Sequence, residues 1–180
     1  MWEQIVSTIS AEFSDLDDVR EITQMSLRLL IAALLGGILG WEREQSGKAA
    51  GIRTHMLVAI GAALFILIPQ QAGIPDAELS RVIQGVITGV GFLGAGAILK
   101  GNDEKHLKGL TTAAGIWLTA AIGVATGLGR ESSAILCTLL ALVVLFVVPK
   151  LLQVFESKPK SDDNSKSDDN NKPDDHNKPL

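Results

Sequence analysis

The chain has 180 residues and a formal net charge of −4, and 47% of its residues are hydrophobic against 20% that are charged. So small a net charge does not indicate nucleic acid as a partner, and the single cysteine, Cys137, excludes an intrachain disulfide. The apolar residues gather in long stretches, which a soluble domain of this length could not cover with its remaining polar chain.

The N-terminal segment, residues 1–21, has an amphipathic pattern. Trp2, Ile5, Val6 and Ile9 recur at helical spacing, and acidic side chains occupy the other face. A helix of this kind lies along the membrane surface or packs on the rest of the chain. Because the basic residues that favour a membrane surface are scarce here, both alternatives stay open, together with partial disorder.

Five apolar stretches fill residues 22–152, and each approaches the roughly 20 residues that an α-helix needs to cross a bilayer. Their glycines suit membrane helices, in which small residues let backbones approach closely. We therefore predict an all-α fold, a polytopic membrane helix bundle with about five transmembrane helices. The predicted spans are residues 22–41, 55–72, 82–99, 112–129 and 133–152.

Three residues mark the predicted ends of these spans. Thr54 and Thr111 precede the second and fourth spans, where a hydroxyl oxygen can accept a hydrogen bond from a free N–H group. Trp41 closes the first span, as an anchor at the membrane interface would.

The orientation follows from Lys and Arg, because acidic residues contribute little to topology. Twelve basic residues lie in the two loops and the tail on one side, and three lie on the other side. The three are Arg20, Arg81 and Arg130. We therefore predict that the N-terminus is outside and the C-terminus is in the cytoplasm.

Arg28 lies inside the first predicted span, roughly 9 Å from its outer start at about 1.5 Å per residue. A charged side chain at membrane depth is costly and is a candidate for function. Arg28 either extends outward to the headgroups or turns into the bundle. In the second case we expect it to face Gln84, Asp76 or Glu78.

The predicted cytoplasmic loop, residues 42–54, holds charged side chains of both signs, and His55 follows it. The positive-inside rule accounts for the basic residues but not for Glu42 and Glu44. We interpret the loop as a structured, interacting element. The alternative is a loop whose basic residues serve topology alone.

The third span carries the pattern G-x-G-x-x-G at Gly89, Gly91 and Gly94. A dinucleotide site needs this pattern after a strand, in a βαβ unit, so no nucleotide is expected here. Helix packing explains the glycines better, because small residues four apart let helices approach. Alternatively, the glycine-rich span breaks and exposes carbonyl groups, as in transporter sites.

The same small-residue spacing occurs in two other spans. Gly36 and Gly40 are four apart in the first span, and Thr119, Gly123 and Gly127 are four apart in the fourth. Together with Gly85 and Gly89 in the third span, these pairs predict a compact bundle, with homo-oligomerisation as a further option.

The C-terminal segment, residues 153–180, has a six-residue Asp/Asn/Lys repeat and almost no apolar side chains beyond Phe155. Such a chain cannot offset the entropy of ordering, so we predict a disordered tail. Its Asp pairs, with His176, have no fixed geometry for a cation.

His55, His106 and His176 are expected in loops or the tail without metal-ligand spacing. We therefore expect no catalytic residues, no metal and no cofactor.

Three segments resemble, in order, the three signatures of the MgtC/SapB family of membrane proteins. The first is Gly40-Trp41-Glu42-Arg43-Glu44 through Lys48 to His55, the second is residues 89–96, and the third is residues 109–117. The signature positions carried over to this chain are Arg28, Glu42, Arg43, Lys48, Gly51, Arg53, Thr54, His55, Arg81, Gln84, Gly89, Gly91, Gly94, Gly96, Gly109, Thr111, Thr112 and Trp117.

The resemblance implies a multi-pass protein of the bacterial inner membrane, linked to growth under magnesium limitation. For the best-known member it implies restraint of the F-type ATP synthase, which affects the membrane potential. Virulence-associated members carry a folded cytoplasmic domain after the last span. This chain is expected to be a short form without that domain, so a role in virulence does not follow.

These observations leave two functional hypotheses. The first is a non-catalytic regulatory protein that lies in the lipid bilayer and acts by contact with another membrane complex. The second is a transporter or channel for a small ion or solute, with Arg28 and a broken third span along its path. A weaker option is a magnesium sensor that uses the acidic tail.

Overall fold

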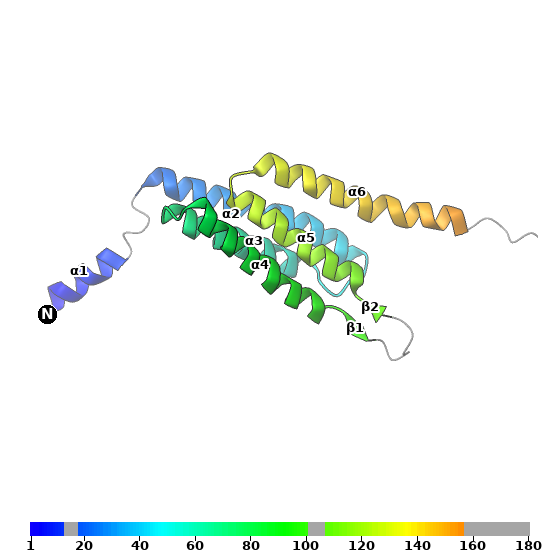
Figure 1. Cartoon of the computed structure of the whole chain (residues 1–180), viewed down its shortest axis with the longest axis horizontal. Coiled ribbons are helices and arrows are strands. Elements are labelled where there is room, and N and C mark those ends of the chain that lie inside the picture. The colour runs from blue at the N-terminus through cyan, green and yellow to red at the C-terminus, as the bar shows by residue number, and fades with distance from the viewer. Residues whose placement is uncertain (13–17, 101–106, 157–180) are drawn as a thin grey trace, which may run out of the picture.

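The computed structural model describes residues 1–12, 18–100 and 107–156. In these parts of the chain, six helices and one short strand pair follow one another (Figure 1). The repeat tail, His106 and His176 lie outside the described residues. The elements are α1 (Trp2–Glu12), α2 (Val19–Gln45), α3 (Ile52–Gln71), α4 (Asp76–Gly96), β1 (Leu99–Lys100), β2 (Leu107–Lys108), α5 (Leu110–Gly127) and α6 (Glu131–Glu156).

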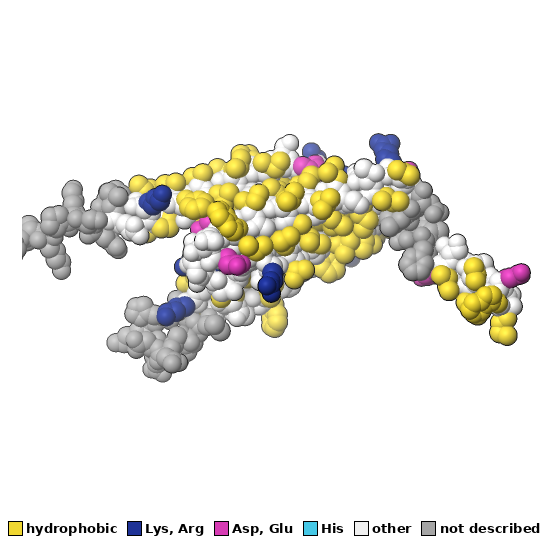
Figure 2. Space-filling view, turned by 180° about the vertical axis from the view of Figure 1, so that it is seen from behind, with side chains coloured by type: hydrophobic (Ala, Val, Ile, Leu, Met, Phe, Trp, Pro, Cys, Tyr) yellow, Lys and Arg dark blue, Asp and Glu magenta, His cyan; other side chains and the backbone are white. Residues whose placement is uncertain are grey.

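The all-α membrane fold is confirmed. Within the described residues, the five helices from α2 to α6 are long and apolar enough to cross a membrane. They are in most cases longer than the apolar stretches, because polar turns extend them. The last helix, for example, runs from Glu131 to Glu156 rather than over 133–152. Hydrophobic side chains run along the bundle on the face that Figure 2 shows, as a lipid-facing surface requires.

Helix α1 stands apart from the bundle (Figure 1), and none of its residues is buried. Its apolar side chains are exposed, with Trp2 at 76%. The alternative in which this segment packs on the bundle is therefore wrong. That α1 lies on the membrane surface stays a prediction.

The bundle is built around α3 and α5. Helix α3 packs against α2 and α5, while α4 packs mainly on α5, and α6 lies over α2 and α5 (Figure 1). Buried residues are frequent in α2, α3 and α5, whereas α4 buries only Leu79 and Gly94 among its residues. Helix α4 is therefore a peripheral helix with most of its surface uncovered.

Glycines bring α2 and α5 against α3, as their spacing predicts. A Cβ built on Gly40 would lie 2.6 Å from the Cα of Ile52, and one built on Gly36 would lie 2.6 Å from the carbonyl oxygen of His55. On the other side of α3, a Cβ on Gly127 would lie 2.7 Å from the carbonyl oxygen of Ala63. No larger residue fits at these positions without moving a backbone.

The corresponding prediction for α4 is wrong within this chain. No described heavy atom lies within 4 Å of a Cβ built on Gly85, Gly89, Gly91 or Gly96. Of the signature glycines in α4, Gly94 makes the contact, with a built Cβ 3.6 Å from the Cβ of Ala113 in α5. The alternative of a broken third span is also wrong, because α4 is continuous from Asp76 to Gly96.

The predicted helix caps are wrong as well. Helix α3 begins at Ile52 and α5 at Leu110, so Thr54 and Thr111 lie inside the helices that they were expected to precede. Gly109 precedes α5 with φ of 101°, a left-handed conformation that glycine adopts without strain. It follows β2, which pairs antiparallel with β1.

Candidate functional site

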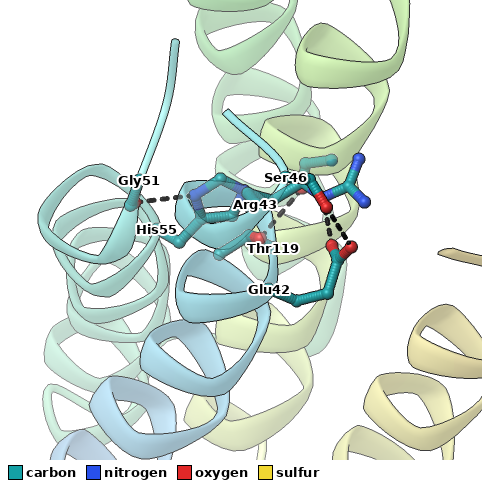
Figure 3. Close-up of polar contacts among 7 residues, drawn as sticks. Glu42, Arg43, Ser46, Gly51, His55 and Thr119 are labelled. Carbon is teal, nitrogen blue, oxygen red and sulfur yellow. Dashed lines mark hydrogen bonds and ion pairs between the residues drawn. The ribbon is translucent and has the colours of Figure 1, made fainter. Parts of the chain in front are cut away.

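The first signature forms a buried polar cluster where α2 ends and α3 begins. Glu42 and Arg43 belong to α2 rather than to a loop, and their relative exposures are 3% and 4%. The Nε–H of Arg43 donates to the Glu42 carboxylate, and the Ser46 hydroxyl donates to the other carboxylate oxygen over 2.9 Å (Figure 3). The charged pair is buried at the end of α2 and therefore does not simply mark topology.

Glu44 connects the two helices across the turn. Its Oε2 accepts a hydrogen bond of 3.0 Å from the backbone N–H of Ile52, the first residue of α3. The exposed N–H groups at a helix start carry a partial positive charge, which a carboxylate stabilises. The N-cap position itself is Gly51, and a Cβ there would collide with the Glu44 carboxylate. The hypothesis of a structured first loop is consistent with these contacts.

His55 is not a loop residue, contrary to the sequence-based expectation. It lies in the first turn of α3 with no exposed surface. Its Nδ1 lies 3.0 Å from the carbonyl oxygen of Gly51 (Figure 3). A carbonyl only accepts, so Nδ1 carries the proton of this bond. The other ring nitrogen, Nε2, is buried and has no hydrogen-bond partner among the described residues.

A second polar group lies at the opposite end of the bundle, around Arg28. The Arg28 guanidinium donates to the carbonyl oxygen of Gly127 over 2.9 Å and to Oε1 of Gln70 over 3.3 Å. Its Nε lies 3.7 Å from a carboxylate oxygen of Glu131, at the start of α6. Arg28 therefore turns into the bundle, but the expected partners Gln84, Asp76 and Glu78 are wrong.

We expect Arg28→Ala to lower the free energy of unfolding by about 1.5–3 kcal/mol, the usual value of a hydrogen bond to a charged group. The variant loses the contacts that join α2 to α3, α5 and α6 at this end. Unfolding of the purified chain in mixed micelles by dodecyl sulfate measures the change. Arg20→Ala is the matched control, since Arg20 is exposed and its change should be within about 0.5 kcal/mol. Equal stabilities of the two variants would contradict the role of Arg28.

The structure does not bring the remaining signature residues into one site. Lys48 and Arg53 are exposed near the buried cluster, while Thr112 is buried in α5. Trp117 is 48% exposed. Arg81 pairs with Glu78 on the exposed surface of α4, 3.6 Å apart, and Gln84 is also exposed there. These residues belong to different faces and ends of the bundle.

Several residues of these clusters were not singled out from the sequence. Gln70 and Glu131 bind Arg28, and Ser46 binds Glu42. The spacing of Ser46 four residues after Glu42, at the end of an apolar helix, was the one local signal. The partners of Arg28 are 42 and 99 residues away in sequence for Gln70 and Gly127, and no local pattern reveals them.

Among the described residues, no three His, Cys, Asp or Glu side chains gather in a group that could hold a metal ion. The arrangement instead fixes the ends of helices. The hydrogen bond of Glu44 joins α2 to α3 at the His55 end, and the Arg28 contacts join α2 to α3, α5 and α6 at the other end, while α4 lies outside both clusters.

These features define a multi-pass membrane protein of the helix-bundle class. The chain belongs to the MgtC family, whose model matches residues 29–154. It is similar to SrpB of Synechococcus elongatus, with 44% identity over 132 residues, which are 67% of this chain and 72% of SrpB. It is also similar to MgtC of Brucella abortus, with 41% identity over 125 residues, which are 69% of this chain and 51% of that protein.

A further relative is the protein named "Putative magnesium transporter YhiD" of Escherichia coli, which is 43% identical over 133 residues. The match covers 69% of this chain and 60% of YhiD. The chain thus spans about half to three fifths of the MgtC and YhiD relatives. No solved structure matches the chain.

Proposed function

We propose that the chain is a non-catalytic regulatory protein of the bacterial inner membrane, with its N-terminus outside and its C-terminus in the cytoplasm. It acts by docking α4 on another membrane protein complex. The observation that carries this proposal is the surface of α4, where a Cβ built on glycines that match a family signature has no described heavy atom within 4 Å.

Three of the four open glycines of α4 share one face with Phe92, while the fourth, Gly91, lies on another side of the helix. At about 100° per residue, Gly85, Gly89, Phe92 and Gly96 lie within about 60° of one another. We call this face the α4 stripe. Phe92 is 86% exposed, and the three glycines are open. Gly94, which contacts α5, lies on the opposite side of the helix. Glycines beside a protruding aromatic ring let a neighbouring helix approach closely, so the stripe suits contact with another membrane helix.

The complex that we propose as partner is the F-type ATP synthase. The proposal rests on membership of the MgtC family and on the first-signature residues, which resemble those of members linked to this enzyme and to magnesium limitation. In this role the chain restrains the synthase and thereby affects ATP level and membrane potential when magnesium is scarce. Such a role needs a docking surface and no catalytic group.

We expect Gly89→Leu to abolish the regulatory effect while the chain still inserts and folds. A leucine at this position occupies space into which a partner helix would pack, and no described heavy atom lies within 4 Å of its Cβ. The measurement is ATP synthesis and membrane potential in cells grown at low magnesium, with membrane level and stability of the variant measured in parallel.

Ala95→Leu is the matched control for this experiment. Ala95 is exposed on the same helix, about 90° around it from the α4 stripe, so the variant adds the same bulk on a different face. Wild-type activity of Gly89→Leu, or equal losses in both variants, would contradict docking through the stripe.

A transporter of a small ion is the second candidate function, and the name of YhiD favours it. The structure gives this candidate less support. Helix α4 is continuous, and Arg28 is held by Gly127 and Gln70. The test is magnesium flux into proteoliposomes that contain the chain. The Arg28→Ala variant is assayed in a lipid and at a temperature in which it stays folded. Flux that depends on the chain and is lost in this variant would favour transport over regulation.

A further inference from the structure

A cavity of about 370 Å³ opens beside the buried polar cluster, between α2, α3, α5 and α6. This volume lies in the usual range of about 300–1,000 Å³ for small-molecule sites. Its polar groups, Arg43, His55 and Thr111, come from the ends of α2, α3 and α5 that meet at the His55 end. The rest of its wall is mainly apolar and includes Leu118 of α5 and Cys137 of α6. The cavity therefore has a polar end and an apolar body.

The polar end contains an atom that lacks a partner. Nε2 of His55 is buried and unbonded among the described residues, and such an atom normally finds a partner. Gly115 also lines the cavity, and a Cβ built on it would lie 3.5 Å from this nitrogen. The missing side chain of Gly115 thus leaves space beside Nε2 on the cavity side.

The chemistry of Nε2 suits an acid head group. Because Nδ1 donates to Gly51, Nε2 is an acceptor in the neutral ring and a donor in the protonated ring. A carboxyl group bonds to it in both cases, as O–H to N or as O⁻ to H–N⁺. A phosphate monoester shares this property, whereas a methyl ester offers neither a proton nor a charge.

Arg43 lines the same cavity and has N–H groups that can serve as a second anchor. A guanidinium has five N–H groups, and the described hydrogen bonds use only its Nε–H, which donates to Glu42. Glu42 offsets one positive charge, but the cluster with Lys48, Arg53 and Glu44 still sums to +1, from three basic and two acidic residues. An oxyacid is therefore favoured over a neutral head group by charge as well as by hydrogen bonding.

The apolar body is long enough for part of one hydrocarbon chain. Thr111 and Leu118 are seven residues apart on α5, which corresponds to about 10 Å along the helix. We propose that the cavity binds a single-chain amphiphile with a carboxylate or phosphate-monoester head between Arg43 and Nε2 of His55, and with its chain between α5 and α6. This proposal is independent of docking by the α4 stripe, because α4 does not line the cavity.

Cys137 is a direct reporter of the bound chain, since it lines the cavity and is the only cysteine of the protein. The experiment measures the rate of Cys137 alkylation by a small maleimide, with the full chain in phosphatidylcholine nanodiscs. The probes are palmitic acid, palmitoyl lysophosphatidic acid and methyl palmitate. We expect the acids to slow alkylation, and we expect methyl palmitate to need an at least tenfold higher concentration, equal to about 1.4 kcal/mol.

The two acids separate the two sources of the head group. Protection at lower concentration by palmitic acid indicates a fatty acid, and protection at lower concentration by lysophosphatidic acid indicates a phosphate-headed lipid. Equal protection by methyl palmitate would show that the head group is not recognised and would overturn the proposal. Absence of protection by every probe would also overturn it.

Gly115→Ala tests the position of the head group. The added methyl lies 3.5 Å from Nε2 and 3.9 Å from Cδ of Arg43, which are ordinary contacts, so the chain should fold. We expect the acids to need an about tenfold higher concentration for protection in this variant. The control is Gly61→Ala, where no described heavy atom lies within 4 Å of the added methyl. Unchanged protection in Gly115→Ala would contradict the site.

Discussion

Glu42→Ala is expected to lower the free energy of unfolding by about 3–5 kcal/mol, because it leaves the Arg43 charge buried without its partner. Both side chains are almost fully buried, at 3% and 4% exposure, and the carboxylate also accepts from Ser46. The measurement is unfolding of the purified chain by dodecyl sulfate in mixed micelles. The loss of stability in Arg43→Leu can differ in size, because this variant leaves the Glu42 carboxylate without Arg43 but still bonded to Ser46.

Two further variants make this prediction specific. The double variant Glu42→Ala, Arg43→Leu removes both charges and should recover much of the stability, because an apolar replacement of a buried pair is often neutral. Glu44→Ala is the matched control in the same turn. Glu44 is exposed and caps Ile52, so its loss should cost only about 1 kcal/mol. Similar effects of Glu42→Ala and Glu44→Ala would contradict the burial of the ion pair.

Gly123→Leu is expected to prevent formation of the native bundle. A Cβ on Gly123 would collide with the carbonyl oxygen of Ala59 and lie 2.9 Å from the Cβ of Ala62, and both belong to α3. Backbone atoms cannot rotate away as a side chain can. Even Gly123→Ala should therefore lower the free energy of unfolding by about 1–3 kcal/mol, the usual cost of overpacking, or by more. The measurement is the fraction of folded protein in mild detergent, followed by dodecyl sulfate unfolding.

Gly89→Leu is the control for packing, because no described heavy atom of the same chain lies within 4 Å of a Cβ at this position. It should keep the stability of the unaltered protein within about 0.5 kcal/mol. The two leucine variants thus separate glycines that hold this chain together from a glycine that is open for a partner. A folded Gly123→Leu variant of normal stability would contradict the close contact of α5 with α3.

The sequence predicted the five spans. It also predicted that α2 and α5 pack closely through their glycines. Apolar length is a local property, and each helix satisfies its own backbone hydrogen bonds in lipid, so local sequence is enough to find it. The pairs Gly36 with Gly40 and Gly123 with Gly127 were also interpreted correctly, because small residues four apart lie on one face of a helix.

The same pattern failed in α4 because spacing does not reveal which way a helix face turns. Gly85 and Gly89 share a face, but this face points away from α5, while Gly94 points towards it. The rotation of a helix about its axis is set by contacts with distant parts of the chain. Arg28 shows the same limit, since its partners are on α3, α5 and α6.

The site at the His55 end was partly predictable. The mixed charges after the first span indicated a structured connection, and Glu44 does bond to Ile52. The burial of His55 was missed because polar residues next to a span are normally assigned to a loop. Helix α3 begins at Ile52, so His55 falls in its first turn against α2 and α5.

The central claim is that the α4 stripe docks on another membrane complex, and photocrosslinking from Phe92 tests it most directly. A photoreactive phenylalanine analogue replaces Phe92 in cells grown at low magnesium, and the same analogue at Leu136 on α6, which is 59% exposed, is the control. We predict a discrete adduct with a subunit of the F-type ATP synthase from position 92 and none from position 136. Adducts with lipid alone, or the same adducts from both positions, would contradict the claim.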